Sequence, residues 1–160
     1  MRNIIKIGLG AAVLLLIMSM TQTDVKKYKC MIQMSNYEGE GAYIVVSLIN
    51  PEGKYEKTLY VHGDDDEWYY ELTSWWKFQG KKHGKLDGIT GSTIAGGERG
   101  YNVLKIDASK INKGYKLRFE SAVEARNYHE KDIEFELTTA NLAKKMNGKG
   151  FIRYIRLVEQ

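Results

Sequence analysis

The fold of this chain is decided by residues 42–61, which read AYIVVSLI-NPEG-KYEKTLYV. The first part, residues 42–49, is dense in β-branched and large apolar side chains, a composition typical of a central β-strand. Asn50-Pro51-Glu52-Gly53 follows as a turn, because proline restricts one backbone angle and glycine accepts an unusual one. A period-two alternation then resumes, with Leu59 and Val61 expected on one face. The stretch predicts a β-hairpin.

The same period of two continues outward along the chain. On the N-terminal side, apolar side chains recur at every second position from Tyr28 to Met34, which predicts a half-buried strand. On the C-terminal side, further strands are expected at residues 101–106, 115–125, 133–137 and 151–158. Short strands separated by turns are typical of a sandwich. We therefore expect an all-β fold, an antiparallel immunoglobulin-like β-sandwich.

Two segments interrupt the strand pattern. Leu72, Trp75 and Trp76 lie at helical spacing within residues 68–76, which favours a short helix there. Residues 80–100 are rich in glycine and show no sustained periodicity, so we expect one long ordered loop. Long loops inside compact domains are usually functional or disordered. This loop is therefore the first place to search for a site.

The N-terminal residues are typical of an export signal. Arg2 and Lys6 precede an uncharged apolar run, residues 7–20. The run is short for a transmembrane helix, which needs about 20 apolar residues, yet no small-x-small cleavage site follows it. We expect residues 1–23 to be an apolar helix, either a signal peptide or an N-terminal membrane anchor, and residues 24–160 to be the β-sandwich domain. Both alternatives place the domain in the periplasm or on the outer face of the cytoplasmic membrane. Only an uncleaved segment would contact the membrane.

Charge and cysteine content exclude several classes of partner and site. The chain has 24 Lys and Arg against 20 Asp and Glu, and Arg2 and Lys6 account for two of the cations. Both signs are scattered along the chain, which is not the footprint of a protein that binds nucleic acid. Cys30 is the only cysteine, so neither an intrachain disulfide nor a multi-cysteine metal site can form.

The glycine-rich loop contains one stretch with a chemical interpretation, Asp87-Gly88-Ile89-Thr90-Gly91-Ser92-Thr93. It resembles the signal of extracytoplasmic flavin transferases: Asp, two variable residues, Ser or Thr, Gly, Ala, and a final Thr or Ser that receives the flavin. Ser92 stands in the alanine position. The resemblance implies a covalent FMN on Thr93, with Asp87, Thr90, Gly91 and Ser92 completing the attachment signal. The alternative is an ordinary turn, in which hydroxyls satisfy backbone groups.

Attachment at Thr93 also makes a structural demand. A phosphoester to a threonine requires a hydroxyl on a loop that a second enzyme can bind. The neighbouring glycines would let the backbone of that loop bend. The isoalloxazine ring would supply the electron chemistry, while the protein supplies attachment and orientation. Trp75, Trp76 and Tyr101 are the aromatic side chains that we consider for stacking on the ring.

A wider resemblance covers most of the chain after residue 23. The motifs that carry it are Lys57-Thr58-Leu59, Trp75-Trp76, Thr90-Gly91-Ser92-Thr93, the strand 101–106, Lys113-Gly114-Tyr115 and Glu124-Ala125-Arg126. Their order is similar to that of the predicted periplasmic proteins grouped as domain of unknown function 2271. The resemblance implies an exported sandwich domain found alongside flavin transferases and membrane redox proteins, with no established activity.

Two functions follow from these patterns. We expect an exported accessory protein of a flavin-linked envelope redox system, carrying covalent FMN at Thr93 and working with a flavin transferase and a membrane redox protein. The alternative is a non-catalytic periplasmic β-sandwich that binds a membrane or envelope protein partner. Its motivation is the aromatic cluster within residues 68–76, since Trp and Tyr are favoured at interfaces. Part of this cluster is also expected to close one end of the core.

The sequence shows no pattern of an enzyme site. His62 precedes the acidic run 64–67, which offers cation ligands, but the spacing of a helix-loop-helix calcium site is absent. A solvated acidic turn is the better interpretation. No Gly-x-Ser-x-Gly elbow exists. We therefore assign no catalytic residue and no metal ligand, and expect the protein not to be an enzyme.

Overall fold

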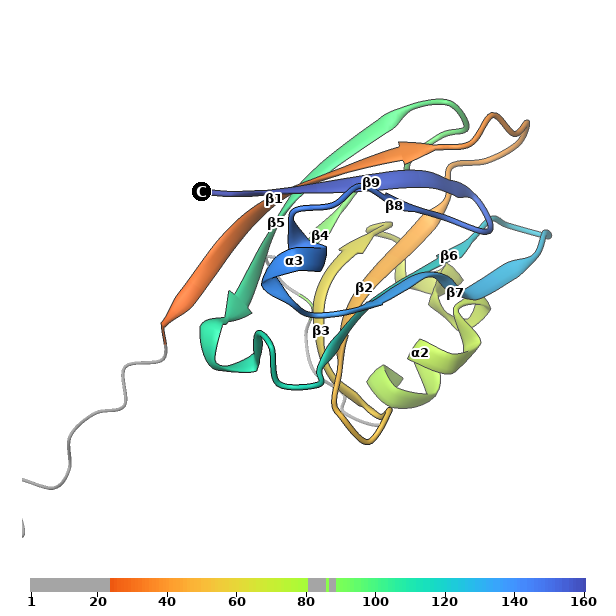
Figure 1. Ribbon diagram of the computed structural model, residues 1–160. Coiled ribbons are helices and arrows are strands. Elements are labelled where there is room, and N and C mark those ends of the chain that lie inside the picture. Colours follow the sequence, from red (N-terminus) through yellow and green to blue (C-terminus); the bar gives the residue numbers. More distant parts are fainter. Residues whose placement is uncertain (1–23, 81–85, 87–88) are drawn as a thin grey trace, which may run out of the picture.

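The protein is described by a computed structural model, which covers residues 24–80, 86 and 89–160. Residues 1–23, where a signal peptide or anchor is expected, lie outside the described residues, as do Asp87 and Gly88 of the flavin-type motif. Two β-sheets packed face to face form the body of the molecule (Figure 1). The expected all-β sandwich is confirmed.

The smaller sheet has four strands and is antiparallel throughout. In spatial order it contains β5 (Arg99–Asp107), β1 (Val25–Met34), β9 (Ile152–Glu159) and β8 (Met146–Asn147). β1 lies between β5 and β9, and its buried side chains from Tyr28 to Met34 alternate as the sequence predicts. The pairing brings the two ends of the described chain together in one sheet.

The larger sheet has five strands, with the predicted hairpin at its centre. In spatial order it contains β4 (Thr90–Gly91), β3 (Tyr55–His62), β2 (Tyr43–Ile49), β6 (Lys116–Ala122) and β7 (Tyr128–Glu136). Every residue of β2 is buried, which confirms the expected central strand. β4 runs parallel to β3, whereas the expectation was a purely antiparallel sandwich.

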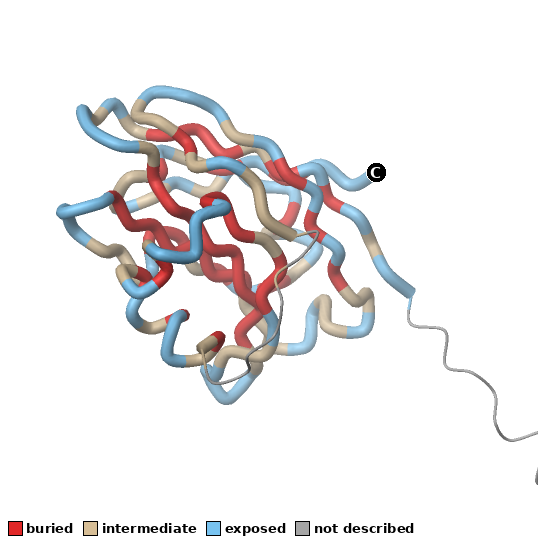
Figure 2. The backbone as a smooth tube through the Cα atoms, turned by 180° about the vertical axis from the view of Figure 1, so that it is seen from behind, coloured by how far each residue is buried: buried red, intermediate tan, exposed pale blue. Residues whose placement is uncertain are grey.

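The main core lies between the two sheets, where Figure 2 shows the buried stretches running along the central strands. Ile32, Val46, Leu104, Phe119 and Ile155 are all fully buried there and come from five different strands. Burying one such side chain stabilises the fold by about 1.5–3 kcal/mol. A single continuous apolar interior therefore holds the sheets together.

A second apolar cluster covers the outer face of the five-stranded sheet. It is built by the 3₁₀-helix η1 (Asp66–Glu71) and the α-helix α2 (Thr73–Gln79), which pack Tyr69, Leu72 and Trp75 onto β2 and β3. Asp65 begins η1, because its side chain accepts a hydrogen bond from the Glu67 amide. The predicted short helix is thus confirmed as α2. Of the aromatic side chains in residues 68–76, Tyr69 and Trp75 are buried in this second cluster.

The predicted alternation fails in one strand. Leu59 and Val61 are both buried, but Leu59 belongs to the core between the sheets and Val61 to the cluster beneath α2. The cause is a β-bulge: the pairing register of β3 shifts between Val46 and Ser47 of β2. A bulge adds one residue to one strand and so reverses the face of everything beyond it. Tyr60 and His62 consequently turn towards the opposite sheet.

Other boundaries differ from the sequence prediction for local reasons. The strand expected at 115–125 ends at Ala122, because a turn follows in which Ala125 has φ 54°. β7 starts at Tyr128, well before the predicted 133. The short elements η3 (Ala108–Lys110), α3 (Thr139–Leu142) and β8 carry too few residues for a periodic signal. Within residues 24–80, 86 and 89–160, no helix has the length and apolar character needed to cross a membrane.

Candidate functional site

The Thr93 loop is held by backbone pairing on both of its sides. Before it, Val61 donates an amide hydrogen bond to the carbonyl of Ile89 at 2.8 Å, and β4 pairs with the end of β3. After it, Ala42 and Ile94 exchange two backbone hydrogen bonds of 2.8 and 3.2 Å. The expected single long loop is therefore anchored to the sandwich at two points. Ser92 and Thr93 form the short unpaired span between them.

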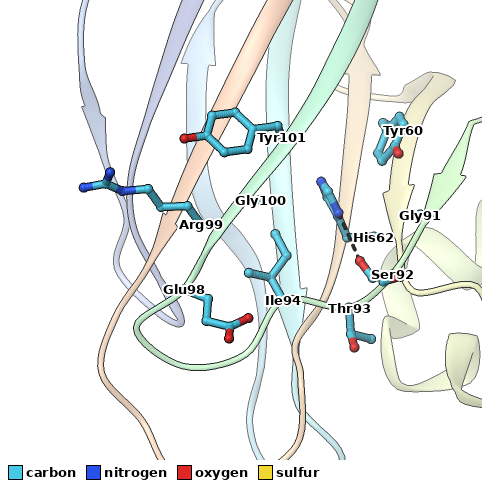
Figure 3. Close-up of a pocket in the computed structure, with 10 residues that line it drawn as sticks. All are labelled: Tyr60, His62, Gly91, Ser92, Thr93, Ile94, Glu98, Arg99, Gly100 and Tyr101. Atoms are coloured by element: carbon cyan, nitrogen blue, oxygen red, sulfur yellow. Dashed lines mark hydrogen bonds between the residues drawn. The ribbon is translucent and has the colours of Figure 1, made fainter.

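Thr93 itself is half-buried, and its side chain occupies space that Gly41 leaves open. A β-carbon built on Gly41 would lie 2.4 Å from Thr93 Oγ1, well inside contact distance. Figure 3 shows the Thr93 side chain pointing away from His62, at the edge of the site. Within the described part of the chain, no hydrogen bond involves the Thr93 hydroxyl. The hydroxyl is thus placed on an ordered loop without a fixed partner in the described part of the chain.

A cavity of about 250 Å³ lies beside this loop, at the open edge between the two sheets (Figure 3). Its walls come from β3, from residues 91–94 and from residues 98–101 at the start of β5. Gly100 makes the close packing possible, since a β-carbon there would lie 2.1 Å from Ile94 Cδ1. Three segments that are distant in sequence thus meet around one opening.

His62 forms the floor of this cavity and is only 4% exposed. Its Nδ1 lies 3.2 Å from the Ser92 carbonyl oxygen, and its Nε2 lies 2.9 Å from Nδ2 of Asn102. A carbonyl oxygen can only accept, so Nδ1 must carry the hydrogen and donate it. Nε2 is then the acceptor of the Asn102 amide hydrogen. Burial lowers the pKa of His62, against a smaller opposing effect of the Ser92 carbonyl, so the ring is held neutral.

The His62–Asn102 hydrogen bond joins the two sheets. His62 ends β3 in one sheet, and Asn102 belongs to β5 in the other. Asn102 is buried, and its Oδ1 atom has no hydrogen-bond partner among the described residues. An unsatisfied buried acceptor costs about 1–3 kcal/mol. The unpaired Asn102 Oδ1 therefore lowers stability. The His62–Asn102 hydrogen bond lies directly behind the cavity.

Two tyrosines flank the cavity in different ways. Tyr60 packs against His62 with ring centroids 4.9 Å apart, and its hydroxyl fills the space beside Gly91. Tyr101 is 52% exposed at the rim, with Lys29 Nζ 5.2 Å from its ring centroid. Tyr101 is the one aromatic side chain considered for stacking that lines the same cavity as Thr93. Trp75 and Trp76 contact Tyr69 in the helical cluster instead.

The structure brings together only part of the predicted attachment signal. Thr90 and Gly91 form β4, Ser92 is exposed and offers its carbonyl to His62, and Thr93 reaches the cavity edge. Asp87 lies outside the described residues, so its place relative to Thr93 stays a prediction. Sequence reasoning missed the residues opposite the loop: Tyr60, Asn102 and Arg99. The two-residue spacing of Tyr60 and His62 was the one available signal that both face the same way.

The acidic run after His62 does not assemble with it. His62 points inward to Ser92 and Asn102, while residues 64–67 are exposed and Asp65 is used as a helix cap. Among residues 24–80, 86 and 89–160, no group of three or more His, Cys, Asp or Glu side chains could hold a metal ion. Cys30 is fully buried, and burial raises the pKa of its thiol to about 12.

A second buried titratable group lies on the other face of the same sheet, under α2. Glu120 is fully buried, and its Oε2 accepts a hydrogen bond from the Tyr128 hydroxyl. Its Oε1 has no partner among the described residues. Burial raises the pKa of Glu120 to about 7, although hydrogen bonds from Tyr128 and Tyr55 and the charge of Arg118 oppose the shift.

Arg118 continues this cluster towards the surface. Its guanidinium donates to Glu134 at 2.6 Å, to Glu130 at 2.9 Å and to the Tyr55 hydroxyl at 3.1 Å. Phe78 of α2 stacks on Tyr55, with ring centroids 5.3 Å apart. The cluster is closed by the helix and lines neither described cavity. Within the described residues, it is a network of largely buried polar groups between the sheet and α2.

Comparison with known proteins identifies one family. Residues 25–154 match the model of the family described as "Predicted periplasmic protein (DUF2271)". The match runs from the start of β1 into β9 and therefore includes the Thr93 loop and the cavity beside it. Neither a curated protein nor a solved structure matches the chain.

Proposed function

This chain belongs to the DUF2271 family of predicted periplasmic proteins, and from that premise we propose that it is a periplasmic accessory of a flavin-linked redox system, with FMN attached to Thr93. In this proposal the protein is not an enzyme. A flavin transferase attaches the cofactor, and a membrane redox protein exchanges electrons with it. The observation that carries the proposal is the position of Thr93, on an anchored surface loop at the edge of a partly aromatic cavity.

The loop geometry supports recognition by a second enzyme. Ser92 is exposed and Thr93 half-buried, while the backbone on both sides is tied down by β3 and by Ala42. A short ordered span presents one hydroxyl without requiring the domain to unfold. The phosphoester would form between Thr93 Oγ1 and the FMN phosphorus of a flavin dinucleotide supplied by the transferase. The pyrophosphate bond of the dinucleotide would break so that AMP leaves, and the threonine proton would pass to a base of the transferase.

The cavity supports a partly exposed position for the flavin ring. Its volume of about 250 Å³ is below the roughly 300–1,000 Å³ of pockets that enclose a whole drug-sized ligand. It would therefore receive one edge of the isoalloxazine ring, reached through the flexible ribityl phosphate. Tyr101 offers a stacking surface at the rim. The remaining edge would stay accessible to a redox partner, as electron exchange requires.

Intact-mass spectrometry of the protein exported together with a flavin transferase tests this proposal. We expect one FMN per chain, and we expect Thr93→Ser to keep it because the signal accepts either hydroxyl. Thr93→Ala should lose it completely. Ser92→Ala, which restores the alanine of the signal, should raise the modified fraction. An FMN adduct that survives Thr93→Ala, or its absence from the wild-type protein, would contradict the proposal.

A second candidate function, binding of an envelope protein, is favoured by two exposed aromatic side chains. Tyr70 is 55% exposed and Trp76 is 37% exposed, whereas their neighbours Tyr69 and Trp75 are buried. Exposed Tyr and Trp are favoured at protein interfaces. Cross-linking in intact envelopes should give a defined adduct that is lost with Tyr70→Ser and Trp76→Ser together. An adduct that forms equally with the double variant would count against this function.

A further inference from the structure

A second cavity, of about 440 Å³, lies on the outer face of the four-stranded sheet. One residue from each strand forms its base, in a row across the sheet: Arg99 pairs with Gln33, Gln33 with Tyr154, and Tyr154 with Asn147. The apolar side chains of β1, such as Ile32, face the core from the opposite side. The cavity is therefore built on a rigid surface that the core packing does not use.

This cavity is lined by cations and by no carboxylate. Arg99, Lys145 and Arg153 contribute three positive charges, and the other lining residues are neutral. In the described part of the chain, none of these three side chains takes part in a salt bridge. Three cations that converge without a counter-ion favour an anion as ligand.

Arg99 is held in place by a buried amide. Gln33 is 9% exposed, and its Oε1 accepts a hydrogen bond from Arg99 Nε at 2.6 Å. The other end of the Gln33 amide donates to the carbonyls of Gly97 at 2.9 Å and Glu98 at 3.2 Å. The guanidinium is thus oriented through Nε, and among the described residues no partner occupies its two terminal amino groups, which can receive an incoming anion.

The remaining polar groups suit the same ligand. Lys145 is positioned over the Tyr154 ring, with Nζ 5.1 Å from the centroid. Asn36 and Asn147 add amide groups to the wall. A planar guanidinium donates two parallel hydrogen bonds to a phosphate, and a lysine adds a point charge.

We propose that this cavity binds the phosphate group of a phosphate ester. Its three cations can neutralise the one or two negative charges of a phosphate ester, and its volume leaves room for the organic part of the ester. The same face of the sheet carries further cations at Lys27, Lys29, Lys105 and Arg156, which would attract anions towards it. The ester can be a soluble metabolite or the headgroup of an anionic phospholipid. The proposal does not depend on FMN attachment at Thr93.

Calorimetric titration of the full-length protein with glycerol 3-phosphate at low salt tests the soluble source. We expect saturable binding of one equivalent, weakened at least about tenfold by Arg153→Gln and by Lys145→Gln. Neither residue lines the cavity beside Thr93, whereas Arg99 lines both cavities. Lys105→Gln is the matched control, because it removes one positive charge from the same face outside the cavity. It should change the affinity less than about twofold.

Co-sedimentation with lipid vesicles tests the other source. Binding to phosphatidylglycerol vesicles but not to phosphatidylcholine vesicles, lost with Arg153→Gln and kept with Lys105→Gln, would identify the lipid headgroup as the ester. Saturable glycerol 3-phosphate binding with the same variant pattern would identify a soluble ester. Two results would overturn the proposal: no binding to either probe, or equal weakening by Arg153→Gln and Lys105→Gln, which would indicate only diffuse attraction to a basic face.

Discussion

The two faces of the five-stranded sheet bury titratable groups in opposite ways. His62, on the inner face, has both ring nitrogens hydrogen-bonded, and Glu120, on the outer face, has one carboxylate oxygen bonded and one without a described partner. Burial lowers the pKa of the base and raises that of the acid, so both favour the neutral form. Their effects on stability therefore run in opposite directions with pH.

The two regions also differ in access. The His62 region opens onto the cavity beside Thr93, whereas the Glu120 region is covered by Trp75 and Phe78 of α2. A covered polar cluster acts mainly on the stability of the fold. A polar cluster beside an open cavity can affect stability and can also contact a ligand. Of the two regions, only the one at the inter-sheet edge borders a described cavity.

The largest expected effect on stability comes from removing Trp75, which covers the Glu120 region from α2. Trp75 is fully buried, and its Nε1 donates to Thr58 Oγ1 at 2.9 Å. Trp75→Ala should lower the free energy of unfolding by about 4 kcal/mol, through lost burial and the cavity that it leaves. Urea denaturation measures the loss. Trp76→Ala, at a partly exposed position, should cost clearly less. Equal losses would show that α2 does not seal the cluster.

Glu120→Gln should change the pH dependence of stability. The folded pKa of Glu120 is about 7 against an ordinary 4.5, so between these values the native state keeps a proton that the unfolded state releases. Wild-type stability must then fall as pH rises from 4.5 to about 7, by about 3 kcal/mol from this group. The variant should lack this fall in denaturation series across the same range. Parallel curves for both proteins would contradict the raised pKa.

His62→Phe should remove a pH dependence of stability that has the opposite sign. Its effect on the free energy of unfolding should be smaller than the effects of the two variants above. The native state holds His62 neutral while the unfolded chain takes up a proton below its ordinary pKa of 6.5, so the contribution of His62 to wild-type stability should fall as pH drops below 6.5. The variant should lose this acid-side fall. At about pH 8 it should be less stable by about 2 kcal/mol, because the Ser92 carbonyl and the Asn102 amide lose their partner. A variant as stable as wild type would show that the bridge does not hold the sheets.

The smallest expected effect concerns the Thr93 loop. Gly41→Ala places a β-carbon 2.4 Å from Thr93 Oγ1, so the loop must shift, at a cost of about 1 kcal/mol. Gly80→Ala is the control, because Gly80 has helical angles and its nearest contact would be an ordinary 3.6 Å. Thermal unfolding compares the two. If Gly41→Ala is as harmless as the control, Thr93 is not packed against Gly41.

The fold was largely predictable because its signals are local. The burial alternation of β1 and the dense apolar run of β2 each report the environment of one strand, and both are confirmed. The Thr90 to Thr93 stretch was also singled out from sequence alone, but its role as an attachment signal stays a prediction, and its Asp87 lies outside the described residues. The bulge in β3 was not predictable, because no residue type marks it and its position depends on the pairing with β2.

By itself, the sequence determined the sandwich class, the hairpin at residues 42–61, the short helix and the candidate hydroxyl at Thr93, since each rests on side-chain period or on a contiguous motif. Only the tertiary structure decided what surrounds that hydroxyl. His62 and Asn102 are 40 residues apart in the chain, and Gln33 and Arg99 are 66 apart. Such neighbours are set by strand order and register across the sheets, which a one-dimensional pattern does not contain.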